Sequence, residues 1–195
     1  MTAGIAMLHR RSYIAAQYPI RPLPAIPEKG AFSMDTQVNP PAPIDLHREL
    51  HGYFIEDIEE GMSAFYSRTV TEADIVLFAG ISGDFNPLHL NREFAEQTRF
   101  GGNIAHGMLT ASLISTVVGT KLPGPGAIYL SQNLRFTAPV KAGDTVTARV
   151  VVTEVDVAKR RCRLDTKCTV GNQIVVTGDA LTMVPSRKSF EAAAT

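Results

Sequence analysis

The 195-residue chain is poor in several features that would place it in a specialised class of protein. It has no tryptophan, 7% aromatic residues and two cysteines, and its 19 basic residues balance its 19 acidic residues. A surface that binds nucleic-acid backbones needs an excess of positive charge, so we expect no nucleic-acid partner. No uninterrupted apolar run reaches the roughly 18 residues of a membrane helix, so we expect no membrane association.

The two cysteines, Cys162 and Cys168, lie six residues apart in a segment with the alternation of a β-strand. Along one strand this spacing separates them by roughly 20 Å, which is too far for a disulfide. They also lack the further ligands that a metal site needs at a suitable spacing. We therefore expect two core thiols, no metal, and a reducing compartment such as the cytoplasm.

Proline is concentrated at the N-terminus, where seven of the twelve prolines fall within residues 1–45. Because proline removes backbone donors and disfavours helix in its predecessor, we predict a flexible extension there. One domain, residues 46–186, and a C-terminal tail, residues 187–195, then follow. Residues 1–27 carry three arginines and no acidic residue, as organelle import sequences do. Import is thus the alternative to an extension without a targeting role.

The rest of the chain shows helical signals first and strand signals afterwards. We predict a strand at 63–70, helices at 72–79, 92–97 and 106–120, and strands at 128–136, 145–155, 161–170 and 173–184. Thr71 and Asp74 form a capping pair for the first helix, and the third helix is almost wholly apolar. Alternating strands need one buried face, and the apolar helix is the element to cover it. The pattern predicts an α+β fold in which an antiparallel sheet wraps around a central helix.

The segment from Phe78 to His89 carries the residues that could take part in catalysis. Its glycines, aspartate, asparagine and proline follow one another closely, which indicates a turn-rich loop. Asp84 and His89 can converge on one water molecule from such a loop, as a general base and a general acid. The same spacing also suits a structural turn, with Asp84 as a cap and His89 in packing contacts.

This segment resembles the signature of the MaoC-like (R)-specific enoyl-CoA hydratases. The matching residues are Phe78, Ile81, Ser82, Gly83, Asp84, Asn86, Pro87, Leu88, His89 and Ala95. The resemblance continues through 105–109, 128–132 and 139–144, and it covers roughly residues 60–185. It implies a hot-dog fold and a homodimer, or a dimer of dimers, with active sites at the subunit interface.

The resemblance also implies roles for individual residues. Asp84 would be the general base and His89 its acid–base partner, while Asn86 would order the loop. Gly107, at the start of the apolar helix, would offer its amide to the thioester oxygen, and Ser115 would line the pocket. Close packing is the alternative for Gly107, and a structural role is the alternative for Ser115. His106, next to Gly107, is interpreted as a neutral histidine that caps the helix start.

The activity implied is reversible syn hydration of trans-2-enoyl-CoA to (3R)-3-hydroxyacyl-CoA in fatty acid metabolism. No metal or redox cofactor is expected, because the thioester itself acidifies C2. The alternative enzyme is a (3R)-hydroxyacyl-ACP dehydratase, which performs the same chemistry on a protein-borne thioester. A non-catalytic acyl-CoA-binding subunit and a thioesterase on the same fold are further alternatives.

Overall fold

The structure, a computed structural model, describes residues 44–193. The expected N-terminal extension therefore lies outside the described residues, apart from Ile44 and Asp45. The segment considered as an import sequence lies wholly outside them. Among the described helices, none combines the length and the apolar character needed to cross a membrane.

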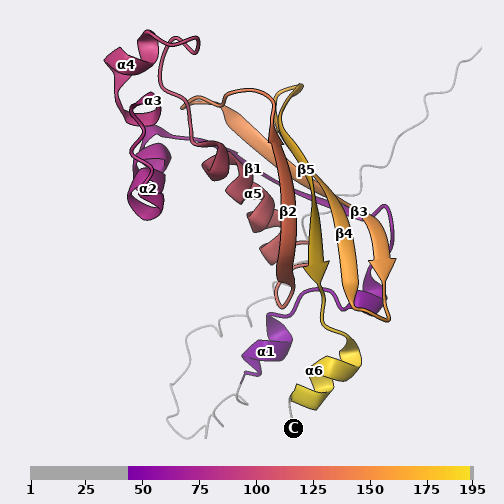
Figure 1. Ribbon diagram of the computed structural model, residues 1–195. Helices are drawn as coiled ribbons and strands as arrows, with labels where there is room; N and C mark the ends of the chain where they lie inside the picture. Colours follow the sequence, from indigo (N-terminus) through magenta and orange to yellow (C-terminus); the bar gives the residue numbers. More distant parts are fainter. Residues whose placement is uncertain (1–43, 194–195) are drawn as a thin grey trace, which may run out of the picture. The chain divides into compact units, whose positions relative to one another are not determined.

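Five antiparallel strands form one sheet in the order β1-β3-β4-β5-β2, with β1 and β2 at its edges (Figure 1). The strands are β1 (Ser63–Thr69), β2 (Ile128–Phe136), β3 (Thr145–Asp156), β4 (Arg161–Val170) and β5 (Gln173–Met183). Each agrees with the strand predicted from the sequence to within one residue at either end. The long strands β3, β4 and β5 follow one another in the chain, so tight turns join them as a meander.

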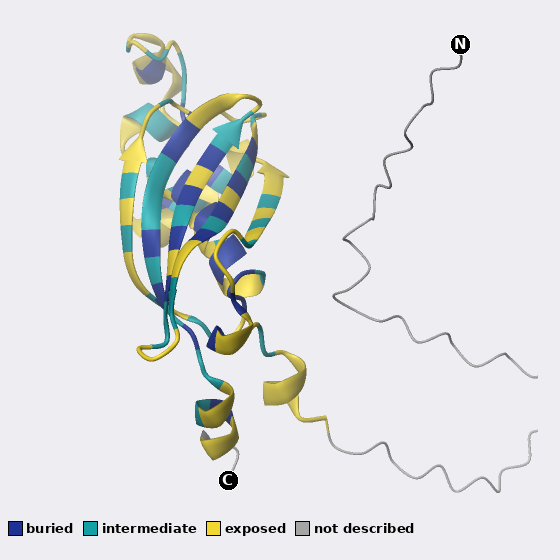
Figure 2. Cartoon of the chain, turned by 90° about the vertical axis from the view of Figure 1, so that its right-hand side faces the viewer, coloured by how far each residue is buried: buried dark blue, intermediate teal, exposed yellow. Residues whose placement is uncertain are grey.

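Helix α5 (Gly107–Thr120) lies against one face of this sheet (Figure 1). Its buried side chains include Leu113, Ile114 and Val117, which belong to the same apolar core as the inward residues of β3, β4 and β5. Buried and exposed residues alternate along these strands, as Figure 2 shows. The predicted α+β architecture, an antiparallel sheet around an apolar helix, is confirmed.

Three helices lie together beside the N-terminal end of α5: α2 (Glu72–Ser82), α3 (Pro87–Leu90) and α4 (Arg92–Glu96) (Figure 1). Helix α2 begins with the predicted capping box, in which the Thr71 hydroxyl and the Asp74 carboxylate each bind the other's backbone amide. The bonds from Thr71 to the Asp74 carboxylate, helped by Arg68, lower the pKa of that carboxyl. Helix α2 continues to Ser82, three residues beyond its predicted end, and α3 was not predicted.

Strand β2 departs from simple alternation. The pairing with β5 shifts between Tyr129 and Ser131, where a bulge inserts an extra residue. Because a bulge exchanges the two faces of the strand, Tyr129 and Gln132 are both partly buried although their parity differs. Ile128 and Leu130 are exposed as a result.

Both cysteines lie on β4 with fully buried thiols and form no disulfide. Burial raises the pKa of Cys162 to about 11 and that of Cys168 to about 12. Thiols that stay protonated in this way are poor nucleophiles. The prediction of two core thiols without a disulfide is confirmed.

The residues predicted as a C-terminal tail form a helix, α6 (Arg187–Ala193). Its Phe190 is buried, and the phenyl ring stacks on the His47 ring with their centroids 4.3 Å apart. His47 belongs to α1 (Leu46–Glu49), and the short 3-10 helix η1 (Ile55–Asp57) supplies an ion pair to Arg187 through Asp57. Contacts with residues far away in the sequence therefore order this segment.

Candidate active site

Asp84 lies in the short loop between α2 and α3. Gly83 ends α2 in the left-handed region, with φ 75°, which glycine adopts without a steric penalty. The Asp84 amide then donates to the Ser82 hydroxyl at 3.2 Å. Asn86 begins α3, because its side-chain oxygen accepts from the Leu88 amide at 3.0 Å. Bonds between near neighbours in the sequence thus shape the loop.

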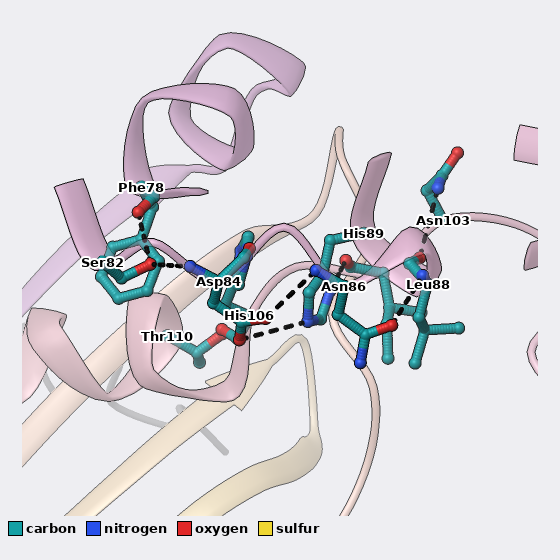
Figure 3. A network of polar contacts seen from close by, with 10 residues as sticks. Phe78, Ser82, Asp84, Asn86, Leu88, His89, Asn103, His106 and Thr110 are labelled. Carbon is teal, nitrogen blue, oxygen red and sulfur yellow. Dashed lines mark hydrogen bonds and ion pairs between the residues drawn. The ribbon is translucent and has the colours of Figure 1, made fainter. Parts of the chain in front are cut away.

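His89 faces this loop from α3. Its Nδ1 lies 2.8 Å from the main-chain carbonyl of Ile104. Because a carbonyl only accepts, Nδ1 carries a hydrogen, and Nε2 is the ring atom directed toward Asp84. The distance from His89 Nε2 to Asp84 Oδ2 is 4.0 Å (Figure 3). The Asp84 side chain is 53% exposed and that of His89 is 10% exposed, so Asp84 is open to solvent while His89 is nearly buried beside it.

The two oxygens of the Asp84 carboxylate have different surroundings. Oδ1 accepts from the Asn86 amide at 3.2 Å, which leaves Oδ2 to face His89. A separation of 4.0 Å is too long for a direct hydrogen bond, but one water molecule can bond both atoms at ordinary lengths. A carboxylate and an imidazole that share a water can take a proton from it and return one.

A cavity of about 410 Å³ opens beside the pair. This volume is in the range of small-molecule sites, and most of the lining is apolar. The lining residues are Asp84, His89, Arg99, Phe100, Ile104, Ala105, His106, Gly107, Met108, Thr110, Phe136, Thr137, Ala138, Pro139, Val140 and Val176. The pair thus faces an apolar space suited to a chain or ring of carbon atoms.

Gly107 is the first residue of α5 and lines the same cavity. Amides in the first turn of a helix have no acceptor within the helix, and the helix dipole is positive there. A side chain at this position would also meet the Phe136 ring, because an added Cβ would lie 2.8 Å from Phe136 Cε1. The geometry therefore suits both interpretations of Gly107, an amide donor and a close packing contact.

The structure brings Asp84, His89 and Gly107 to one cavity, with Asn86 in the adjoining loop. Ser115 is exposed on α5 and does not line this cavity. Eight residues of helix place it roughly 12 Å from Gly107 along the axis. Arg99 does line the cavity, and its guanidinium lies 4.8 Å above the Phe100 ring.

The interpretation of His106 as a side chain that caps the start of α5 is wrong. His106 occupies the N-cap position of α5, but its side chain makes no capping hydrogen bond. The ring instead lies against the loop, with Nε2 2.9 Å from the main-chain carbonyl of Asp84 (Figure 3). The only sequence signal was its place next to Gly107, which is equally consistent with a cap.

Asp84, His89 and His106 together offer three atoms of kinds that bind metal ions, all within 4.8 Å of one another. Carboxylate and imidazole ligands suit several transition metals. His106 Nε2, however, donates to the Asp84 carbonyl, so only Nδ1, which is buried, has a lone pair for an ion. The bonds observed in the site suit proton transfer better than metal binding.

Comparison with known proteins identifies a family. Residues 54–178 match the model of the MaoC-like domain. An (R)-specific enoyl-CoA hydratase of Rhodospirillum rubrum is 53% identical over 69% of this chain and 94% of that protein. A 3-hydroxybutyryl-CoA dehydratase of Methylorubrum extorquens is 47% identical over 73% of this chain and 91% of that protein.

Solved structures agree with this result. The unliganded R-hydratase of Pseudomonas aeruginosa has a TM-score of 0.66 and 43% identity, over 70% of this chain and 88% of its own. The expectation of a hot-dog fold is thereby confirmed. A mitochondrial 3-hydroxyacyl-[acyl-carrier-protein] dehydratase of Solanum lycopersicum is more distant, with 35% identity over 62% of this chain and 73% of that protein.

Proposed function

The chain belongs to the MaoC-like domain family, and from this membership we propose that it catalyses reversible syn hydration of trans-2-enoyl-CoA to (3R)-3-hydroxyacyl-CoA. The observation that carries the proposal is the 4.0 Å separation of Asp84 Oδ2 and His89 Nε2 beside an apolar cavity. The 53% identity to a hydratase over nearly the full length of that relative supports it.

In the hydration direction Asp84 is the general base. Water is a weak nucleophile, so Oδ2 takes its proton as the oxygen bonds to C3. Protonated His89 gives its Nε2 proton to C2 from the same side, because Nδ1 is held by the Ile104 carbonyl. A proton passes from Asp84 back to His89 through the next water, which restores the starting state. Dehydration runs through the same groups with their roles exchanged.

Negative charge develops on the thioester oxygen as C3 is attacked, and it needs a hydrogen-bond donor. The Gly107 amide, at the positive end of α5 and beside the cavity, is the donor we propose. Such donors act on charge that appears only in the transition state, so they raise kcat more than they tighten substrate binding.

The alternatives differ in ways that one assay separates. We expect purified protein to consume trans-2-enoyl-CoA, because the base, the acid and the oxyanion donor lie within one cavity. The measurement is the loss of ultraviolet absorbance of the conjugated thioester over several chain lengths, with an (R)-specific dehydrogenase to identify the product. The same acyl groups on acyl carrier protein form the matched comparison.

Each outcome of this assay assigns one function. Faster turnover on the carrier protein would favour the ACP dehydratase, and release of free thiol would indicate a thioesterase. Binding of acyl-CoA without turnover would indicate a non-catalytic subunit. An (S)-hydroxy product would contradict the proposed stereochemistry.

We also propose a homodimer, or a dimer of dimers, because two apolar surfaces are left uncovered by residues 44–193. On α2 the side chains of Leu77 and Ile81 are 64% and 84% exposed, although a helix apolar on all sides is normally buried. The edge strand β2 exposes Ile128 and Leu130, and along one side its backbone pairs with no strand of the described residues. Ser115, exposed on α5, remains a proposed pocket residue if the second copy completes the site there.

The molecular mass measured by sedimentation at micromolar concentration tests the proposed dimer directly. We expect at least twice the chain mass of 21.1 kDa for the wild type. Ile81→Glu should shift the protein toward monomer, because a carboxylate buried in an apolar interface loses its hydration. The matched control is Val157→Glu, which places the same charge on an exposed residue at the β3–β4 turn. A wild type that sediments only as monomer would contradict the proposal.

We propose residues 46–186 as the catalytic domain, and the family match at 54–178 falls within it. We place the protein in the cytoplasm, where thiols stay reduced, and the two free buried cysteines are in keeping with this.

A further inference from the structure

The geometry points to His106 as a positioning residue that sets the position of the Asp84 loop relative to the start of α5. This inference rests on the proposed function. His106 lines the cavity but is only 2% exposed, so its imidazole is packed among neighbouring groups rather than open to solvent. Its Nε2 donates to the Asp84 carbonyl at 2.9 Å across 22 residues of sequence. The bond joins the loop of the proposed base to the helix of the proposed oxyanion donor.

The Asp84 loop has little else to hold it in place. Residues 83–87 are all exposed, and among the described residues the other hydrogen bonds of Asp84 run to Ser82 and Asn86, its near neighbours. Such local bonds shape the loop, but they do not fix its distance from α5. The His106 bond does so, because the residue that follows is Gly107. One side chain thus relates the position of the base to that of the amide donor.

His106 also supports the second member of the acid–base pair. Its ring lies 3.8 Å from the His89 ring, centroid to centroid, at an interplanar angle of 32°. On another side the Phe78 ring lies 5.1 Å away, so α2 contributes to the packing. His89 is therefore fixed by the Ile104 carbonyl at Nδ1 and by a ring against its face. These two contacts direct His89 Nε2 toward Asp84.

The buried imidazole carries a cost that packing alone does not explain. Nδ1 of His106 is buried and has no hydrogen-bond partner among the described residues. Burying a polar atom unpaired lowers stability, and a phenylalanine would fill similar space without that loss. The Nε2 bond to Asp84 is the one feature that an imidazole provides here and a phenyl ring does not. This contrast separates a positioning role from a packing role.

Two substitutions test the two roles in opposite directions. His106→Phe keeps a ring against His89 but removes the donor, whereas His106→Gln keeps an N–H near Nε2 and removes the ring. Displacement of a reacting group by about 1 Å costs on the order of 100-fold in rate. We therefore expect kcat for enoyl-CoA hydration to fall roughly 10- to 100-fold in His106→Phe, with KM within about threefold of wild type. His106→Gln should keep kcat within about fivefold of wild type.

The matched control is Thr182→Val, which removes another buried side-chain bond to a backbone carbonyl, that of Cys162 at 3.1 Å on β4. It should leave kcat unchanged. If His106 acts only in packing, the phenylalanine variant will be active and the glutamine variant will be damaged. That result, with both variants folded by near-ultraviolet circular dichroism, would overturn the inference.

Hydrogen exchange gives a readout that does not need the activity. Peptides that cover residues 80–90 should exchange faster in His106→Phe than in wild type, and at nearly the wild-type rate in His106→Gln. Exchange in β4 should be the same in all three proteins. Failure of the wild type to hydrate enoyl-CoA would refute the proposed function, while this exchange pattern would still decide whether His106 holds the loop. Unchanged exchange in His106→Phe would overturn the inference whatever the activity.

Discussion

Asp84→Asn should lower kcat for enoyl-CoA hydration by roughly two to four orders of magnitude, the usual value of a general base. The amide oxygen of asparagine can still accept from the Asn86 amide, as Asp84 Oδ1 does at 3.2 Å, so the loop should keep its shape. It cannot take a proton from water. KM should change less than about threefold, because the cavity and the Gly107 amide are untouched. Steady-state kinetics over a range of enoyl-CoA concentrations measure both constants.

The same experiment should include His89→Gln and the double variant. Because the two groups act on one water, we expect each single variant to be severely impaired and the double variant to be scarcely worse. Asp165→Asn is the matched control, since it neutralises a half-buried carboxylate on β4 that pairs with Lys167, and it should leave kcat unchanged. A folded Asp84→Asn protein with wild-type turnover would rule out Asp84 as the base.

Gly178→Ala should destabilise the domain severely, although it adds a single methyl group. An added Cβ at this position on β5 would lie 1.9 Å from the carbonyl oxygen of Asn133 on β2. The backbone of one strand must move to relieve this overlap. We expect a loss of about 3 kcal/mol, the upper part of the range for overpacking. In a domain of this size that loss lowers the melting temperature by roughly 6–12 °C.

Activity should fall as well, because β2 carries Phe136, whose ring packs against Gly107. Gly80→Ala is the matched control: it makes the same change in α2, where nothing lies within 4 Å of an added Cβ. Alanine favours helix over glycine by about 1 kcal/mol, so this variant should melt slightly above wild type. Differential scanning calorimetry separates the two. Equal melting temperatures for Gly178→Ala and wild type would contradict the packing argument.

The close approach at Gly178 also explains a polar contact that crosses the sheet. The Gln132 side chain donates from Nε2 to the Thr166 hydroxyl at 3.1 Å and to the Asp179 carbonyl at 3.1 Å. It reaches both because the bulge turns Gln132 inward and Gly178 has no side chain in its path. Neither feature could be predicted from β2 alone, because both depend on its pairing with β5.

The sequence by itself determined the features that residues close together in the chain decide. The Thr71–Asp74 capping box begins α2, and apolar alternation defines β4, because the interacting groups lie within a few residues of each other. The Asp84 loop belongs to this class, since Gly83 and Asn86 shape it locally. The resemblance to a family then assigned roles that spacing alone left open.

Only the tertiary structure decided where side chains meet partners from distant elements. The His106 ring could cap its own helix or reach the Asp84 carbonyl, and the packing of α2 beside α5 selects the second. Phe190 likewise orders α6, because its ring stacks on the ring of His47, which lies near the opposite end of the described sequence. The free energy of such contacts exists only once both elements are in place, so no local pattern in the sequence reports it.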